Sequence, residues 1–220
     1  MHETATRNNE AMFGSVETVG AAGVFGQVMG LVAVTLGFFA LGAYLGRDIT
    51  GAVVWLPFIG ALGCIIGLNV ASRRSEMLAV TLLFALGVLL GIAVGGVIKF
   101  YAEVDPAAVW QAGGATALFV GALGATGYAI RQDLSRFYRV MFFALLGLIV
   151  FGLIGLFIAI PAGNIIYSLA GLAIFGGYTV LDFNRMRRAG MQESVPLAAG
   201  IFLDVVNIFL FFLRIFGGRS

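Results

Sequence analysis

Seven apolar segments, each long enough to cross a bilayer, occupy most of this sequence. They cover residues 22–46, 52–71, 77–98, 108–130, 139–160, 163–183 and 196–216. A membrane-spanning helix needs about 20 mostly apolar residues. Only 11% of the residues are charged, whereas a soluble domain has about 25%, so too little polar surface remains to cover a soluble fold. The sequence predicts an all-α, polytopic membrane protein with a bundle of seven transmembrane helices.

The domain organisation is simple. Residues 1–21 are polar and partly acidic, and they are predicted to form a short, mobile N-terminal tail. The apolar segment after them is too long for the core of a cleaved signal peptide. Residues 22–220 form one predicted transmembrane domain, with no internal repeat or second domain in the sequence.

The basic residues indicate the orientation of the chain. Nine of the 13 fall on the side that holds the N-terminus: Arg7, Arg73, Arg74, Arg131, Arg136, Arg139, Arg185, Arg187 and Arg188. The other side holds Arg47, Lys99, Arg214 and Arg219. The excess of arginine and lysine marks the cytoplasmic side, which predicts a cytoplasmic N-terminus and an external C-terminus. A re-entrant last segment, with both ends inside, is the alternative.

Composition excludes several classes of protein. The net charge of +2 argues against nucleic acid as a partner. A single cysteine, Cys64, and a single histidine, His2, exclude an intramolecular disulfide, a bis-histidine haem and a multi-histidine zinc site. No cofactor is therefore expected.

Small residues recur at the GxxxG spacing that lets helices approach closely in lipid. The pairs are Gly26/Gly30, Gly42/Gly46, Gly63/Gly67 and Gly91/Gly95. Such pairs form either a dimer seam or contacts within one bundle. With seven spans, packing within the bundle is favoured, and a monomer is expected over a homo-oligomer.

Two aspartates stand out because they interrupt apolar spans. Asp204 lies well inside the last segment, and Asn207, three residues later, shares its helix face. A charge at such a depth costs at least about 2.5 kcal/mol. Asp182 lies near the end of the sixth segment, where Tyr178 and Arg185 share its face. The simpler interpretations are a structural hydrogen bond for Asp204 and an interfacial ion pair with Arg185 for Asp182.

The two spans are consecutive and antiparallel, so both aspartates fall in the cytoplasmic half and neighbouring helices can bring them together. Adjacent carboxylates do not both stay charged at low cost, and such a pair shares a proton. Deprotonated, Asp182 and Asp204 would repel each other and offer oxygens to Ca²⁺. Two carboxylates are far from a full shell of six to eight oxygens. We expect weak metal binding there, which suits permeation more than storage.

The segments GGYTVLDFNRMRR and AAGIFLDVVNIFLFFLRIFGG resemble the last two spans of the Bax-inhibitor family of membrane proteins. The first span, FGQVMGLVAVTLGFFALGAYLG, is similar to that family's opening span. The resemblance covers nearly the whole chain after the tail. It implies a seven-helix bundle with a central C-terminal helix and a pH-sensitive calcium leak, in which Asp182 and Asp204 match the family's proton-sensing pair.

The resemblance also implies a latch arginine on the second helix, for which Arg73 and Arg74 are the nearest candidates. A short chain without a long tail is more similar to the bacterial members, which implies the bacterial plasma (inner) membrane. The expected partners are then the lipid bilayer, Ca²⁺ and protons.

Other functions are weighed against the leak. Intramembrane aspartyl proteases use YD and GxGD motifs, whereas Asp204 follows IFL and Tyr178 is four positions from Asp182, so no enzyme is expected. A retinal protein needs a lysine in its last helix, and the only lysine is Lys99. The main alternative is a non-channel regulator that binds other membrane proteins and modulates stress response or proteolysis.

Overall fold

The computed structural model describes residues 2–155 and 163–218, with side chains from residue 23 onward. This part of the chain contains helices and no β-strand. The long helices are α1 (His2–Gly46), α2 (Trp55–Ala71), α3 (Glu76–Val104), α4 (Pro106–Ala129), α5 (Phe137–Gly155), α6 (Gly163–Met186) and α7 (Ser194–Gly217), and two short 3₁₀ turns are η1 (Gly51–Val54) and η2 (Met191–Glu193). Seven of these segments are long and apolar enough to span a membrane, which confirms the predicted fold class.

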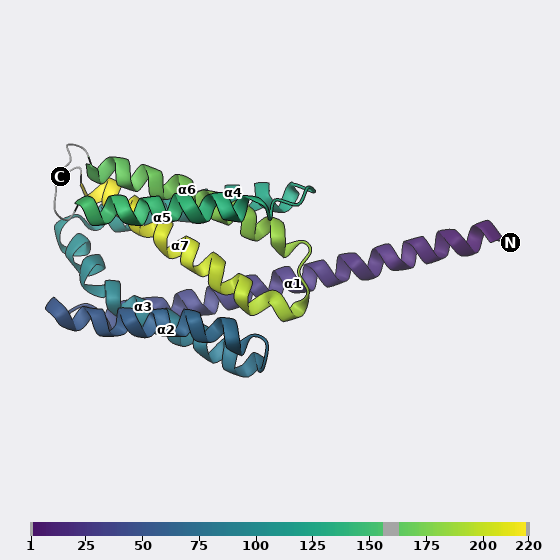
Figure 1. Ribbon diagram of the computed structural model, residues 1–220, viewed down its shortest axis with the longest axis horizontal. Helices are drawn as coiled ribbons and strands as arrows, with labels where there is room; N and C mark the ends of the chain where they lie inside the picture. The colour runs from purple at the N-terminus through teal and green to yellow at the C-terminus, as the bar shows by residue number, and fades with distance from the viewer. Residues whose placement is uncertain (1, 156–162, 219–220) are drawn as a thin grey trace.

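Most helix bounds lie within three residues of the predicted segments, and α1 and α3 extend furthest beyond them. The predicted end of the fifth span, residues 156–160, lies outside the described residues. Helix α3 continues past Lys99 to Val104, because a charged residue ends an apolar segment without breaking a helix. Helix α1 extends back through the predicted tail to His2, and this extension projects away from the bundle (Figure 1).

Local sequence signals set the helix boundaries. The hydroxyl of Ser75 accepts a hydrogen bond from the backbone N–H of Leu78 at 3.3 Å and caps α3. Asp105 separates α3 from α4, and its carboxylate accepts from the first free N–H groups of α4 at 3.1 and 3.2 Å. Pro106 follows at the first helical position, where a missing N–H is harmless. These caps allow a very short turn between two long spans.

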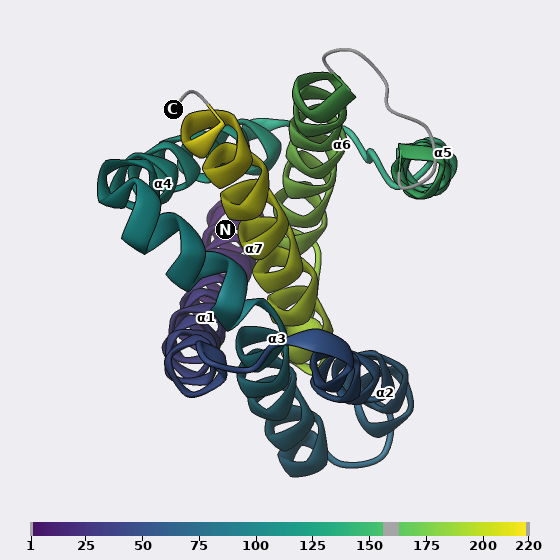
Figure 2. The ribbon, with the colours of Figure 1, turned by 90° about the vertical axis from the view of Figure 1, so that its left-hand side faces the viewer.

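Helix α7 lies at the centre of the bundle, as expected. It packs against α6, α4, α1 and α3, and Figure 2 shows it between the α1–α4 side and the α6 side of the molecule. The side chains of Ile201, Phe202 and Ile208 have no exposed surface. Helix α5 is at the opposite extreme, because it packs mainly on α6 and stands at the edge of the bundle (Figure 2).

Two of the GxxxG pairs named above meet inside the bundle. Gly42 and Gly46 of α1 face α3, and Gly91 and Gly95 of α3 face α1, so closely that an added Cβ would collide with the backbone of the other helix. Packing within one chain is confirmed for these pairs. At Gly26 and Gly30, in contrast, an added Cβ meets nothing within 4 Å.

Candidate functional site

Asp182 is buried where three helices meet. It lies one turn before the end of α6, with 8% of its surface exposed. One carboxylate oxygen, Oδ1, accepts a hydrogen bond from the hydroxyl of Tyr138 in α5 at 2.6 Å. The other, Oδ2, lies directly against Gly200 of α7, where a Cβ would collide with it. Glycine is therefore what lets the α7 backbone come this close to the carboxylate.

Asp204 is buried on the other side of the same helix–helix contact. It is 4% exposed, and its Oδ2 lies 3.3 Å from the hydroxyl oxygen of Thr179 in α6. That hydroxyl lies closer, at 2.9 Å, to the carbonyl of Phe175 in the preceding turn. A hydroxyl has one proton to donate, so the shorter contact is the better place for it.

The two aspartates thus occupy one short stretch of the α6–α7 contact. Asp182 of α6 reaches Gly200 of α7, and Asp204 of α7 reaches Thr179 of α6. Each partner lies within about one helical turn of the opposite aspartate in its own helix. Among the described residues, neither carboxylate has an arginine or lysine within ion-pair distance. The arrangement is a pair of buried carboxylates that is held by hydroxyl groups.

The residues expected to support the pair lie nearby, with different partners. Tyr178 packs its ring against Tyr138, with 6.2 Å between ring centroids. Arg185 pairs with Glu193 in η2 at 2.7 Å. The ion pair between Arg185 and Asp182 that the sequence suggested is therefore not formed. Asn207 donates to the carbonyl of Leu203 in its own helix at 2.8 Å.

The two candidate latch arginines lie in the turn between α2 and α3. Arg73 and Arg74 line a small recess of about 290 Å³ with residues of η2 and the start of α7, including Gln192. Within the described part of the chain, neither arginine has a hydrogen bond or ion pair with Asp182 or Asp204. The structure does not bring them to the pair.

A second polar cluster, which the sequence argument does not identify, lies beside the first. Asn184 of α6 is 1% exposed, and its amide nitrogen faces the carbonyls of Ile130 at 2.7 Å, Gln132 at 3.1 Å and Gly127 at 3.3 Å. Its oxygen accepts from the backbone N–H of Leu134 at 3.2 Å. One amide, with two N–H hydrogens shared among three carbonyls, thus joins the end of α4 to the loop that follows.

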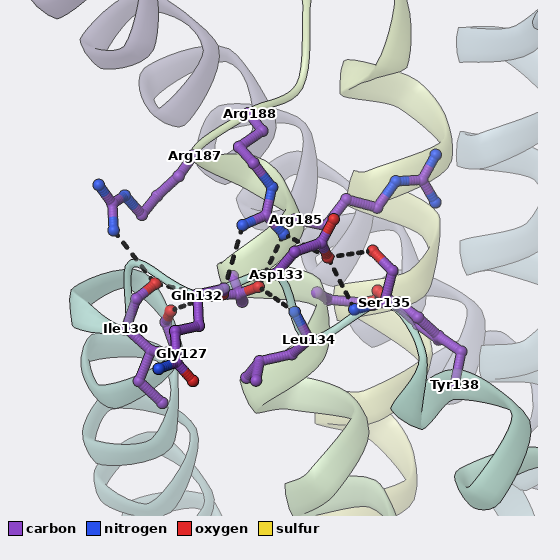
Figure 3. Close-up of polar contacts among 12 residues, drawn as sticks. Gly127, Ile130, Gln132, Asp133, Leu134, Ser135, Tyr138, Arg185, Arg187 and Arg188 are labelled. Atoms are coloured by element: carbon purple, nitrogen blue, oxygen red, sulfur yellow. Dashed lines mark hydrogen bonds and ion pairs between the residues drawn. The ribbon is translucent and has the colours of Figure 1, made fainter.

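Two arginines extend this cluster toward the surface (Figure 3). Arg188 contacts Asp133 at 3.0 Å, and Arg187 donates to the carbonyl of Ile130 at 3.1 Å. Hydrogen bonds from the hydroxyl and the backbone N–H of Ser135, together with Arg188, hold the pKa of the Asp133 carboxyl below its ordinary value. We call Asn184, Arg187 and Arg188, with residues 127–135, the α4–α5 clamp. It fixes the loop that leads directly into Tyr138.

Comparison with known protein families finds a match for this chain. The family model described as inhibitor of apoptosis-promoting Bax1 matches residues 21–220. The chain belongs to the Bax inhibitor-1 family. The match covers all seven candidate spans and includes both aspartates.

Several bacterial relatives of this Bax inhibitor-1 family protein are similar over most of their length. The inner membrane protein YbhL of Escherichia coli K12 is 28% identical, with 73% of each chain covered. A membrane protein of Streptococcus pyogenes serotype M1 is 27% identical, over 95% of this chain and 98% of the relative. A Helicobacter pylori protein is 27% identical, with 87% of each chain covered. These names and the seven spans agree on a multi-pass integral membrane protein.

Proposed function

We propose that this protein is a pH-sensitive calcium leak of the bacterial inner membrane, in which Asp182 and Asp204 form the proton-sensitive gate. The observation that supports this most directly is the burial of two carboxylates at one helix–helix contact, where no arginine or lysine of the described residues lies within ion-pair distance of either. Charged side chains at this depth are costly and are usually functional. A shared proton removes one of the two charges.

The hydroxyl geometry favours a protonated Asp204 in the closed arrangement. Thr179 donates its only proton to Phe175 over the shorter distance, which leaves its oxygen free to accept. A protonated Asp204 can then donate to Thr179. Tyr138 supplies the matching donor to an ionised Asp182. One proton for the pair, carried by Asp204 while Asp182 stays ionised, completes the hydrogen bonding on both sides.

Loss of that proton gives the opening step. Two ionised carboxylates at the α6–α7 contact repel each other, and the low-polarity surroundings strengthen that repulsion. Helix α7 is central, so its displacement from α6 opens a path through the middle of the bundle. The exposed carboxylate oxygens are suited to Ca²⁺, a hard cation. Among the described residues no group of three or more acidic, histidine or cysteine side chains lies close enough together to hold a metal ion.

The orientation is part of the proposal. The turns at residues 72–75, 130–136 and 187–193 lie together, as the contact of Arg188 with Asp133 and the recess shared by Arg74 and Gln192 require. We call this side of the bundle the basic end. The positive-inside rule assigns it to the cytoplasm. The gate then responds to cytoplasmic pH, and the hydroxyls of Tyr138 and Thr179 take the latching role first considered for Arg73 and Arg74.

Calcium flux into liposomes that contain only the purified protein tests this function. We expect flux to rise as the pH of the solution at the basic end rises, because ionisation opens the gate. Asp204→Asn removes the shared proton site, and it should reduce the pH dependence of flux to a small fraction of that of the wild type. An Asp204→Asn protein with an unchanged pH profile would contradict the gate. Absence of flux at every pH would instead favour the regulator that binds other membrane proteins.

Asp133→Asn is the matched control, since it makes the same chemical change at the same end of the bundle. The pKa of Asp133 lies below its ordinary value of 3.8, so its contribution to stability is present above that value. It is lost only as the pH falls through the still lower folded-state pKa. Asp133 is therefore ionised throughout the range from about pH 5 to 8. Asp133→Asn removes the ion pair with Arg188 but no group that titrates in this range, so the pH midpoint of its flux should match that of the wild type.

A further inference from the structure

A large apolar groove lies beside the aspartate pair, and its lining includes Phe183 and Val205, which follow the two aspartates in the sequence. It has a volume of about 1010 Å³ and runs between α1 and α4, with α7 as its floor. Leu36 of α1, Val120 of α4 and Phe209 of α7 represent its lining, and neither aspartate contributes to it. The lining hydroxyl of Thr116 is already bonded to a carbonyl of its own helix at 2.7 Å. The groove therefore suits a hydrocarbon ligand and offers little to water.

The groove opens sideways, toward the lipid that surrounds a seven-span bundle. Along α4 its rim consists of small exposed residues at four-residue spacing, Gly113, Ala117, Gly121 and Ala125. An added Cβ at Gly113 or Gly121 would meet nothing within 4 Å. The α4 residues of the lining extend from Gly113 to Ala129, which is roughly 24 Å of helix at 1.5 Å per residue. This length exceeds one leaflet of a hydrocarbon core about 30 Å thick.

The groove ends in aromatic and cationic groups at the basic end. The rings of Phe25 and Tyr128 meet edge to face at 5.6 Å and join α1 to α4 there. The guanidinium of Arg187 lies over the ring of Tyr128, 5.9 Å from its centroid. Arg131, which is exposed, follows in the loop after α4. A guanidinium is a good partner for phosphate, and basic pockets between transmembrane helices bind anionic lipid head groups.

We propose that this groove binds one anionic phospholipid, with an acyl chain along α4 and its phosphate at Arg187. The lateral opening admits the chain from the bilayer, and the apolar floor on α7 holds it against the central helix. The cation at the rim selects the head group. This site is separate from the calcium gate and does not depend on the proposed leak.

Native mass spectrometry of the purified full-length protein tests the site directly. The protein is titrated in detergent with dioleoylphosphatidylglycerol or with dioleoylphosphatidylcholine, which share their acyl chains. We expect phosphatidylglycerol to bind about fivefold more tightly, the effect of one basic residue near a lipid phosphate. Arg187→Gln should abolish this preference and leave phosphatidylcholine binding unchanged. Equal affinity of the wild type for the two lipids would overturn the head-group assignment.

Variants that fill the groove test the position of the acyl chain. Gly121→Leu places a side chain in the open groove, and it should weaken phosphatidylglycerol binding by about tenfold or more. Gly114→Leu is the matched control, since Gly114 is exposed on the same helix, outside the groove, with nothing within 4 Å of an added Cβ. Ala125→Leu, with Ala122→Leu as its control, repeats the test if one variant folds poorly. Equal lipid binding by each blocking variant and its control would overturn the proposal. Loss of a dimer in Gly121→Leu would also overturn it, because the groove would then be an interface between copies.

Discussion

At the scale of single residues, Asn184 shows how much one buried amide can do in this fold. Its side chain has hydrogen-bond partners in the last turn of α4 and in the loop before α5. No other described side chain forms hydrogen bonds to so many backbone groups of another segment. One of these carbonyls, that of Gly127, belongs to the last turn of α4, where a helix leaves its carbonyls without partners, and the others lie just beyond the helix end.

Replacement of this amide is expected to be costly. In Asn184→Ala the carbonyls of Ile130 and Gln132 keep donors in Arg187 and Arg188. The buried carbonyl of Gly127 and the N–H of Leu134 lose their side-chain partner, at about 1–3 kcal/mol for each group that water does not reach. We expect the free energy of unfolding to fall by about 3 kcal/mol and the thermal midpoint in detergent to fall with it. Asn69→Ala is the control, because that exposed amide bonds only to Ile65 of its own helix. Equal midpoints for the two variants would contradict this role for Asn184.

At the scale of helices, the α6–α7 contact depends on one glycine. Gly200 leaves room for the Oδ2 atom of Asp182, and an added methyl group would collide with that oxygen. Gly200→Ala therefore separates the two helices at the gate, even while the shared proton is present. We expect calcium flux several-fold above the wild type at acidic pH, where the wild type is closed.

Gly147→Ala is the control for Gly200→Ala, since it adds the same methyl group where there is space for it. At Gly147 of α5 an added Cβ meets nothing within 4 Å, so Gly147→Ala should leave the flux at acidic pH unchanged. If Gly200→Ala stays closed at acidic pH with normal folding, the α6–α7 contact is not the gate.

The sequence predicts the helices better than it predicts the contacts between them. Apolar length is a direct consequence of bilayer thickness, so the seven spans follow from the pattern alone. The aspartates can be singled out for the same reason, because charge is rare inside such spans. The contact of Tyr138 with Asp182 could not be predicted in this way, because the two residues lie 44 positions apart and Tyr138 is in a different helix. The role of Asn184 could not be predicted either, because its partners are backbone groups, and a sequence pattern of side chains does not indicate these. Arg73 and Arg74 are the nearest candidates for the latch arginine that the family resemblance implies on the second helix, but they lie in the turn after α2 and face η2.

At the scale of the whole molecule, the account requires the basic end to lie in the cytoplasm. The only native cysteine, Cys64, is buried, so single cysteines introduced in its absence report topology cleanly. Gln192→Cys marks the basic end and Thr50→Cys marks the opposite end, at two exposed positions. In right-side-out spheroplasts we expect a membrane-impermeant maleimide to label Thr50→Cys and to leave Gln192→Cys unlabelled until the cells are lysed. The reverse pattern would invert the orientation and place the gate near the outer face.

The central claim is that Asp182 and Asp204 share one proton that leaves as the gate opens. Infrared difference spectroscopy of the reconstituted protein measures this directly, because a protonated carboxyl has a carbonyl stretch that an ionised one lacks. We predict one such band in the wild type, lost over the same pH range in which calcium flux rises and altered in both Asp182→Asn and Asp204→Asn. A band that persists while the flux rises, or that neither substitution affects, would contradict the account.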